Sequence, residues 1–344
     1  MWNWLRRILS SSTHNNMLTT RAKVVESDGS QEMFSVVSKL DCLTGSDINA
    51  VYCGLILGVH SPIESRFNTT EIAVINKLNK IIGSYDSRMM MIPRLPAVIP
   101  QFMQSVRDEE VSNLRISKQL GKDPSLAADV IKMASSPYYR TDNGVRSLED
   151  AVAVLGNEGI RKLILNAAFR PILNLQYGHY TQLASGYIWR KSEYCAFVAH
   201  CLASQEKQDS FAAYLAGLIM DIGFIVALNV IDVIGELGDA PRSKRFHKIF
   251  FQLSHKVSGL IAADWELPLA VVAAIDDQAE YHDPKSMSTL GAILYHSTLI
   301  SQLQLLIEEQ RIDEDISLRS CRIEGTFQDS GEYCLGELMK YVEK

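Results

Sequence analysis

The sequence lacks the cysteine patterns that define disulfide frameworks and zinc sites. Its six cysteines stand at positions 42, 53, 195, 201, 321 and 334, with no CxxC pair and no framework spacing. Disulfide-rich secreted domains show such spacing, so reduced thiols are the simpler interpretation, most of them acting as small buried apolar residues. We therefore expect a cytoplasmic protein.

An excess of positive charge is also missing. The formal net charge is −6, from 34 Lys and Arg against 40 Asp and Glu. Nucleic-acid binding depends on neutralising phosphates with cationic side chains, so no nucleic-acid partner is expected. Residues 116–127 have the cadence of a helix-turn-helix, but its second helix would present Asp123, Ser125 and Asp129, which repel phosphate. Two packed helices joined by a capped turn are the favoured interpretation.

No apolar run suits a transmembrane helix. The only run of about 20 apolar residues, 211–231, carries Asp221 at its centre and fits a buried helix better. The first nine residues contain paired Trp and paired Arg, but no apolar core or cleavage site of a signal peptide. A docked or frayed amphipathic turn is favoured there over a membrane anchor, because one short segment binds lipid only marginally.

Strand signals are sparse, and helical signals are frequent. No Asn-Gly or Asp-Gly turn stands between two alternating apolar runs. Apolar residues at helical spacing occupy 70–82, and Ser147 with Asp150 three residues on is typical of a capping box. Asp123 followed by Pro124 likewise predicts the start of a helix. The periodicity alone predicts an all-α fold.

Three prolines between residues 89 and 100 mark the clearest boundary, because no helix runs through them. Residues 1–88 are expected to be a helical accessory region, either a small module or an arm packed on the main domain. The main domain is expected over 89–310. Residues 311–344 form a C-terminal extension whose last amphipathic stretch either closes the bundle or mediates self-association.

The run 211–231 resembles the motif helix of the HD superfamily of metal-dependent phosphohydrolases. In that helix adjacent His and Asp residues bind a divalent metal ahead of Ile-Gly and usually a Lys. Here Met220 stands at the His position, Asp221 is kept, and Phe224 stands at the Lys position.

The resemblance extends over residues 91–300 and is closest to the HDOD branch, a mostly non-catalytic signalling relative of the HD hydrolases. Six blocks follow the order that the branch uses. They are Leu95-Pro96, 123–126 with 134–139, 145–151 with Leu155-Gly156 and 160–163, 188–192, 220–223, and His255 with 265–268. The resemblance implies an HD-like multi-helix bundle and a bacterial-type role in signal transduction.

The ligand positions implied by the resemblance have mostly lost their ligands. Lys191 stands where the first His is expected, and an ammonium repels a divalent ion and has no lone pair to donate. Met220 offers only a soft thioether, and Thr298 stands in place of the last carboxylate. Only Asp221 survives, so we expect no metal and no cofactor. Lys191 and Asp221 are interpreted as a structural ion pair that fills the former metal cavity.

Four further polar residues are candidates for a ligand site or a polar pocket: His255, Asp276, Asp277 and His282. Their spacing matches no strong metal template. A lone histidine such as His255 more often satisfies local hydrogen bonds than binds a ligand.

We therefore expect a non-catalytic regulatory protein that transmits a signal by binding a protein partner or a small ligand. The alternative is a metal-dependent phosphohydrolase of nucleotides or cyclic dinucleotides that uses an unconventional site. A second alternative is a helix-turn-helix DNA-binding regulator.

Overall fold

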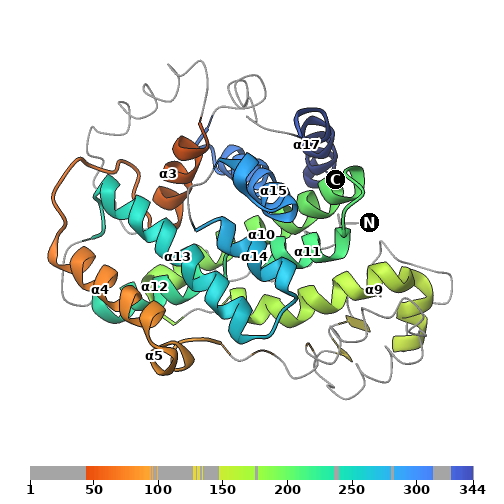
Figure 1. Ribbon diagram of the computed structural model, residues 1–344, viewed down its shortest axis with the longest axis horizontal. Helices are drawn as coiled ribbons and strands as arrows, with labels where there is room; N and C mark the ends of the chain where they lie inside the picture. The colour runs from red at the N-terminus through yellow and green to blue at the C-terminus, as the bar shows by residue number, and fades with distance from the viewer. Residues whose placement is uncertain are drawn as a thin grey trace, which may run out of the picture. The chain divides into compact units, whose positions relative to one another are not determined.

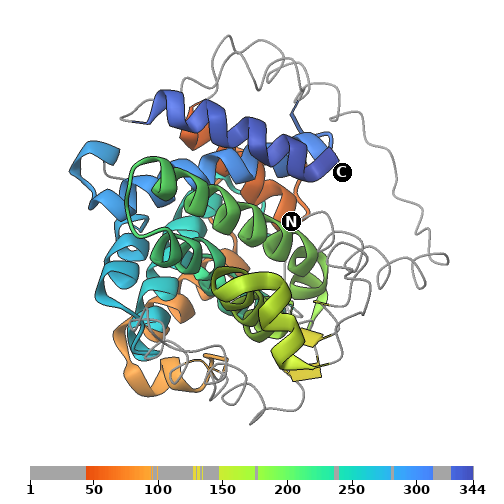
Figure 2. The same cartoon turned by 90° about the vertical axis from the view of Figure 1, so that its right-hand side faces the viewer.

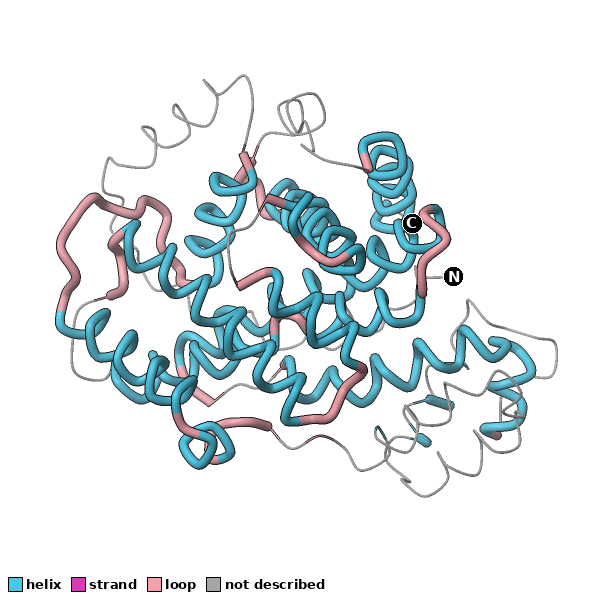
Figure 3. Tube along the Cα trace, in the orientation of Figure 1, coloured by secondary structure: helices cyan, strands magenta, loops and turns pink. Residues whose placement is uncertain are grey.

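The computed structural model describes residues 44–93, 147–174, 177–235, 240–279, 283–312 and 327–343, with isolated positions between 95 and 134 (Figure 1). Within these ranges the structure is helical (Figure 3). Its one strand-like pairing in the described residues is an isolated bridge between Ile63 and Ser243. The predicted all-α fold is confirmed. Positions 1–9, the helix-turn-helix cadence at 116–126, Asp123 and His282 lie outside the described residues.

The helices are α3 (Gly45–Ile56), α4 (Thr69–Gly83), α5 (Tyr85–Met89), α9 (Leu148–Leu173), α10 (His179–Gln205), α11 (Ser210–Ile219), α12 (Ile222–Gly235), α13 (Lys244–Asp264), α14 (Leu269–Asp277), η1 (Pro284–Ser286), α15 (Thr289–Glu308) and α17 (Gln328–Glu343).

The chain divides into two compact units. One comprises Met1–Ser27, Leu95–Arg170 and Glu337–Lys344, and contains most of α9. The predicted capping box at its start is confirmed: Asp150 N donates to Ser147 Oγ and Ser147 N donates to the Asp150 carboxylate, both at 3.1 Å. Gly156 has a φ of 66° and interrupts the helix, a conformation that favours glycine.

The other unit comprises Asp28–Arg94 and Pro171–Gly336. In it α10 packs against α11, α12 and α15, while α13 packs against α12, α14 and α4 (Figures 1 and 2). Two segments, Ser210–Ile234 and Thr289–Glu308, have the length and composition of membrane spans, but 94% and 78% of their apolar windows are buried inside the structure. These segments form the core of the unit.

Helices α3 to α5 are part of this same unit. The buried carboxylate of Glu71 in α4 accepts hydrogen bonds from Ser243 N (2.8 Å) and Ser243 Oγ (3.0 Å), just before α13. Arg88 in α5 holds Asp264 at the end of α13 through two guanidinium nitrogens, at 2.5 and 3.3 Å. Residues 69–89 are thus fastened to both ends of α13, and the boundaries at 88 and 310 stay predictions.

The apolar run 211–231 is not one helix, although its sequence predicts one. Helix α11 ends at Ile219, Met220 and Asp221 form a turn, and α12 starts at Ile222. The N–H of Gly223 donates to Ser258 Oγ on α13 at 2.8 Å, and Phe224 N bonds to Asp221 O only three residues back. Unbroken apolar character hides this turn, because a buried helix and a buried turn use the same residue types.

Gly223 is required by close approach to α13. A Cβ added there would lie 1.9 Å from the carbonyl oxygen of Ser254, a distance that no real contact shows. The glycine therefore fixes how closely α12 and α13 pack, and with it the position of the preceding Asp221.

We predict that Gly223→Ala destabilises the fold by about 3 kcal/mol, at the upper end of overpacking losses, since backbone and not a flexible side chain must move. Gly186→Ala in α10 is the matched control, because nothing lies within 4 Å of its added Cβ. The control should be neutral or stabilising by up to about 1 kcal/mol. Urea denaturation of both variants measures the difference, and equal stabilities would contradict the packing.

Candidate functional site

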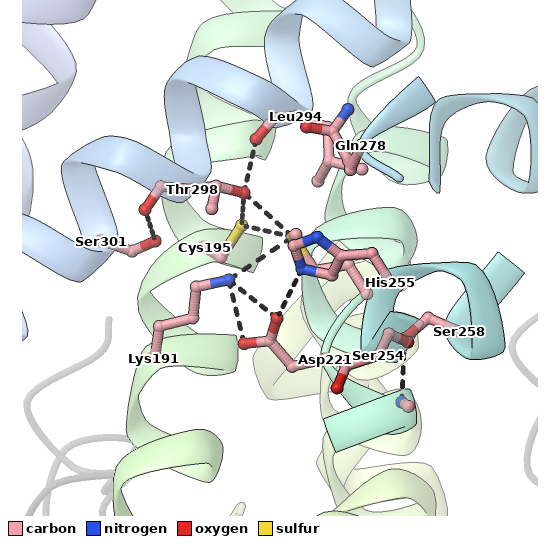
Figure 4. Close-up of polar contacts among 12 residues, drawn as sticks. Lys191, Cys195, Asp221, Ser254, His255, Ser258, Gln278, Leu294, Thr298 and Ser301 are labelled. Atoms are coloured by element: carbon pink, nitrogen blue, oxygen red, sulfur yellow. Dashed lines mark hydrogen bonds and ion pairs between the residues drawn. The ribbon is translucent and has the colours of Figure 1, made fainter. Parts of the chain in front are cut away.

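A buried ion pair lies at the centre of the larger unit. Lys191 Nζ lies 2.9 Å from Asp221 Oδ2 and 3.0 Å from Oδ1, and both side chains are 0% exposed (Figure 4). Lys191 comes from α10, and Asp221 from the turn between α11 and α12. The structure thus brings together the two residues that the sequence suggested as an ion pair.

Local sequence explains why these residues meet. Lys191 and Cys195 stand one turn apart on the face of α10 that packs against α11 and α15. A Cβ added at Gly217 would lie 2.8 Å from the backbone of Ala196, so α10 and α11 approach almost backbone to backbone. The turn that follows α11, which carries Asp221, therefore lies directly beside Lys191.

His255 on α13 lies beside the ion pair. Its Nε2 lies 3.7 Å from Asp221 Oδ1, beyond ordinary hydrogen-bond length, and its ring meets Phe251 and Phe224 edge-on. Burial lowers the pKa of His255, and the attraction of Asp221 opposes this without reversing it. The imidazole is consequently neutral at neutral pH, and the charge on Asp221 is balanced by Lys191.

The pKa of Asp221 depends on two opposing effects, burial and the nearby positive charge of Lys191. Burial by itself would raise the pKa, but the Lys191 ammonium, aided by His255, holds it below its ordinary value. The carboxylate thus stays ionised in a site without water contact. Burial, with the Asp221 charge adding to it, raises the pKa of Tyr52 from α3, so that phenol stays protonated.

Sulfur and hydroxyl groups form the other side of the cluster. Met220 Sδ lies 3.5 Å from Lys191 Nζ, 3.6 Å from Cys195 Sγ and 3.0 Å from Thr298 Oγ1. Thr298 Oγ1 also lies 2.8 Å from the carbonyl oxygen of Leu294, the stronger acceptor for its single proton. The structure therefore gathers all four positions that the resemblance assigned to the metal site. Cys195 was missed, since nothing in its spacing points to the cluster.

These donors do not fit a divalent cation. An ammonium occupies the space beside both oxygens of Asp221, and burial raises the pKa of Cys195, so that it stays an uncharged thiol. Among the described residues no group of three or more His, Cys, Asp or Glu side chains is arranged to hold a metal ion. Hard ions that act on phosphates need several anionic or imidazole ligands, and this cluster offers one carboxylate and one imidazole.

Two further candidates from the sequence, Asp276 and Asp277, have contacts that support the structure or lie near the surface. Asp277 accepts hydrogen bonds from Ser288 N (3.0 Å) and Ser288 Oγ (2.7 Å), and so supports the start of α15. Asp276 lies 3.8 Å from Lys256 in a partly exposed ion pair. Of the predicted pocket residues, His255 joins the Lys191 cluster, and His282 lies outside the described residues.

A second feature, which the sequence did not predict, is an open cavity of about 1120 Å³ at the N-terminus of α10. Its lining is mainly apolar and includes Met90, Ile172, Tyr177 and Val233, with the polar side chains of His179, Asn229 and Asp232. Met90, Tyr177 and Val233 are 84%, 70% and 68% exposed. Such a concave apolar surface with few polar groups is typical of a binding site.

Asp232 already serves a structural purpose in this cavity. Its carboxylate accepts hydrogen bonds from Tyr180 N (2.6 Å), Thr181 N (3.0 Å) and Thr181 Oγ1 (2.7 Å). The N–H groups of Tyr180 and Thr181 lie in the first turn of α10, so Asp232 occupies the position where the helix would attract an anion. The cavity thus suits an apolar group, either uncharged or carrying a positive charge, better than a phosphate.

The fold is that of an HD-like multi-helix bundle, and an ion pair lies at the positions that the sequence resemblance assigned to a metal site. The HDOD domain family matches residues 92–281, more than half of the chain, and the chain belongs to this family. The predicted resemblance is confirmed. No curated protein matches the chain.

Solved structures agree on the fold. An HDOD domain protein of unknown function from Geobacter sulfurreducens is 17% identical, with a TM-score of 0.54 over 78% of this chain and 94% of that one. A proposed signal transduction protein from Marinobacter aquaeolei VT8 is 20% identical, with a TM-score of 0.53 over 83% and 66%. A proposed metal-dependent phosphohydrolase from Shewanella amazonensis SB2B is 16% identical, with a TM-score of 0.50 over 78% and 100%. At these identities the similarity supports the fold alone.

We predict that Lys191→Met destabilises the protein by about 3–5 kcal/mol, because it leaves the Asp221 carboxylate buried without its cation. The double variant Lys191→Met/Asp221→Leu should recover most of this loss, since it removes the stranded charge as well. Guanidinium denaturation of the single and double variants provides the measurement.

Lys244→Met is the matched control for this experiment. Lys244 pairs with Glu64 at the surface, where the two side chains are 57% and 79% exposed, and its removal should cost less than about 1 kcal/mol. A Lys191→Met loss as small as that of the control would show that the buried pair does not support the fold.

Proposed function

We propose that this protein is a cytoplasmic signal-transduction regulator that acts by binding a partner, without hydrolysing a phosphate ester and without a metal or other cofactor. The observation that carries the proposal is the position of the Lys191 ammonium, at 2.9 and 3.0 Å from the two oxygens of Asp221. In a hydrolase of the HD type a divalent ion there would activate water. A fixed ammonium has neither an open coordination position nor a bound water to activate.

The open cavity at the start of α10 supports binding as the activity. Its rim exposes three large apolar side chains within a mainly apolar lining, the kind of surface that water covers poorly. We propose this surface as the place where a protein partner, or a small ligand of similar apolar chemistry, is recognised. The name of the Marinobacter neighbour, which is about signal transduction, is consistent with this role.

Phosphohydrolase activity is the competing function, suggested by the name of the Shewanella neighbour. We predict that protein purified after growth with Mn²⁺ and Fe²⁺ contains far less than one equivalent of either metal. It should not hydrolyse a cyclic dinucleotide or bis-p-nitrophenyl phosphate above the buffer rate. Met220→His alone should change neither result, because Lys191 still places a cation in the site.

Three variants make this test decisive. Stoichiometric metal that is lost on Asp221→Ala and kept on Asp283→Ala, an exposed carboxylate at the start of η1, would overturn the proposal. In the double variant Lys191→His/Met220→His the imidazoles of both lost ligands are restored. Metal binding by this variant would show that the cavity persists and that Lys191 is what excludes the ion.

The binding surface has its own test. Val233→Asp and Tyr177→Ser should each lower partner recovery at least about tenfold in affinity purification from native cells, a loss of about 1.4 kcal/mol or more. Leu269→Ser is the control, because Leu269 is 87% exposed but belongs to α14 and does not line the cavity. Equal recovery with all three variants would place recognition elsewhere on the molecule.

A further inference from the structure

Two cysteines join α17 to α10. Cys334 Sγ lies 2.7 Å from Cys201 Sγ, although 133 residues separate them in the sequence. This separation is longer than the about 2.0 Å of a disulfide bond but shorter than ordinary contact between non-bonded atoms. The two sulfur atoms are therefore already placed so that a bond between them requires little backbone movement.

Other contacts fasten α17 to the neighbouring helices. Ser330, one turn before Cys334 on α17, donates a hydrogen bond of 2.6 Å from its Oγ to Glu206 Oε1, next to the end of α10. Phe327, just before α17, meets the ring of His296 on α15 edge-on at 5.5 Å. The alignment of the thiols thus rests on a contact surface that does not depend on the thiols themselves.

The two cysteines differ in exposure. Cys201 is partly exposed, while Cys334 is fully buried. Cys53 and Cys195 are buried elsewhere, where Cys53 Sγ contacts the carbonyl oxygen of His247 and Cys195 lies beside Met220. Among the described cysteines, Cys201 is consequently the one that a small oxidant reaches, with Cys334 directly behind it.

We propose that Cys201 and Cys334 are a redox modification site, which a peroxide converts into a disulfide that fastens α17 to α10. The Cys201 thiolate attacks one peroxide oxygen, the O–O bond breaks, and hydroxide leaves and is protonated to water. The resulting sulfenic acid is attacked by the Cys334 sulfur, which forms the S–S bond and releases a second water. Overall two thiols and one hydrogen peroxide give one disulfide and two waters, with two electrons passing to the peroxide.

The reverse reaction needs a dithiol reductant. One of its thiolates attacks the disulfide, its second thiol closes the reductant into its own disulfide, and both cysteines return as thiols. In the oxidised protein α17 is held covalently, and in the reduced protein non-covalent contacts such as the Ser330–Glu206 hydrogen bond hold it. This site is independent of the proposed function of the Lys191 cluster.

The test uses the full chain. Protein reduced with dithiothreitol is treated with a small excess of hydrogen peroxide, unreacted thiols are alkylated after denaturation, and peptides are mapped by mass spectrometry. We expect the number of alkylated thiols to fall from six to four, with a linked peptide that joins Cys201 to Cys334. Dithiothreitol should restore all six.

The cross-link should also change stability and motion. Oxidation should raise the thermal unfolding midpoint by about 5 °C or more, as expected for a disulfide that closes a long loop. Hydrogen exchange of the amides in α17 should slow on oxidation. Both changes should disappear in Cys201→Ser and in Cys334→Ser, and persist in Cys42→Ser and Cys321→Ser.

Three results would overturn the proposal. One is a count of six thiols after peroxide treatment. The second is a linked peptide that contains a cysteine other than Cys201 and Cys334. The third is oxidation of Cys201 to a sulfinic acid without any cross-link. Since the wild-type protein alone decides between these results, the conclusion does not depend on whether a serine variant folds.

Discussion

The ionic contact between Lys191 and Asp221 is the constraint on which the rest of the larger unit depends. It lies where α10, the turn after α11, α13 and α15 converge, and both partners are fully buried. A buried charge without a partner is costly, so each of these elements must be placed accurately enough to keep the pair closed. The glycines at 217 and 223 meet this requirement, since they allow the backbones around Asp221 to approach more closely than any side chain would permit.

Much of the fold follows from the sequence. Helical periodicity predicts α4 within about one residue at each end, and the capping box predicts the start of α9. The resemblance to the HD superfamily places residues 191 and 221 in one site. Since one is a lysine and the other an aspartate, their pairing follows from the sequence. The turn at Met220 and Asp221 is not predictable in this way, because the flanking residues are apolar throughout and the N–H of Gly223 after the turn bonds to a side chain 35 residues further along the chain.

The rest of the candidate site depends on distant parts of the chain in a similar way. His255 and Cys195 reach the cluster from separate helices, and the two sulfur atoms near α17 belong to residues 133 positions apart. The cavity combines side chains near residue 90 with others near 177 and 230. No local sequence pattern predicts these long-range contacts, because they depend on how the helices cross and not on the spacing of residues along one helix.

The anchoring of Glu71 to Ser243 has a practical consequence for anyone who wishes to isolate the region that matches the HDOD family. The family match ends at residue 281 and starts at 92, so a fragment cut to those limits would omit α3, α4 and α15. It would expose the inner faces of α12 and α13 and would leave Ser243 without its buried acceptor. Such a fragment would be prone to aggregate, and a workable expression boundary has to be drawn from the packing and not from the recognisable motif.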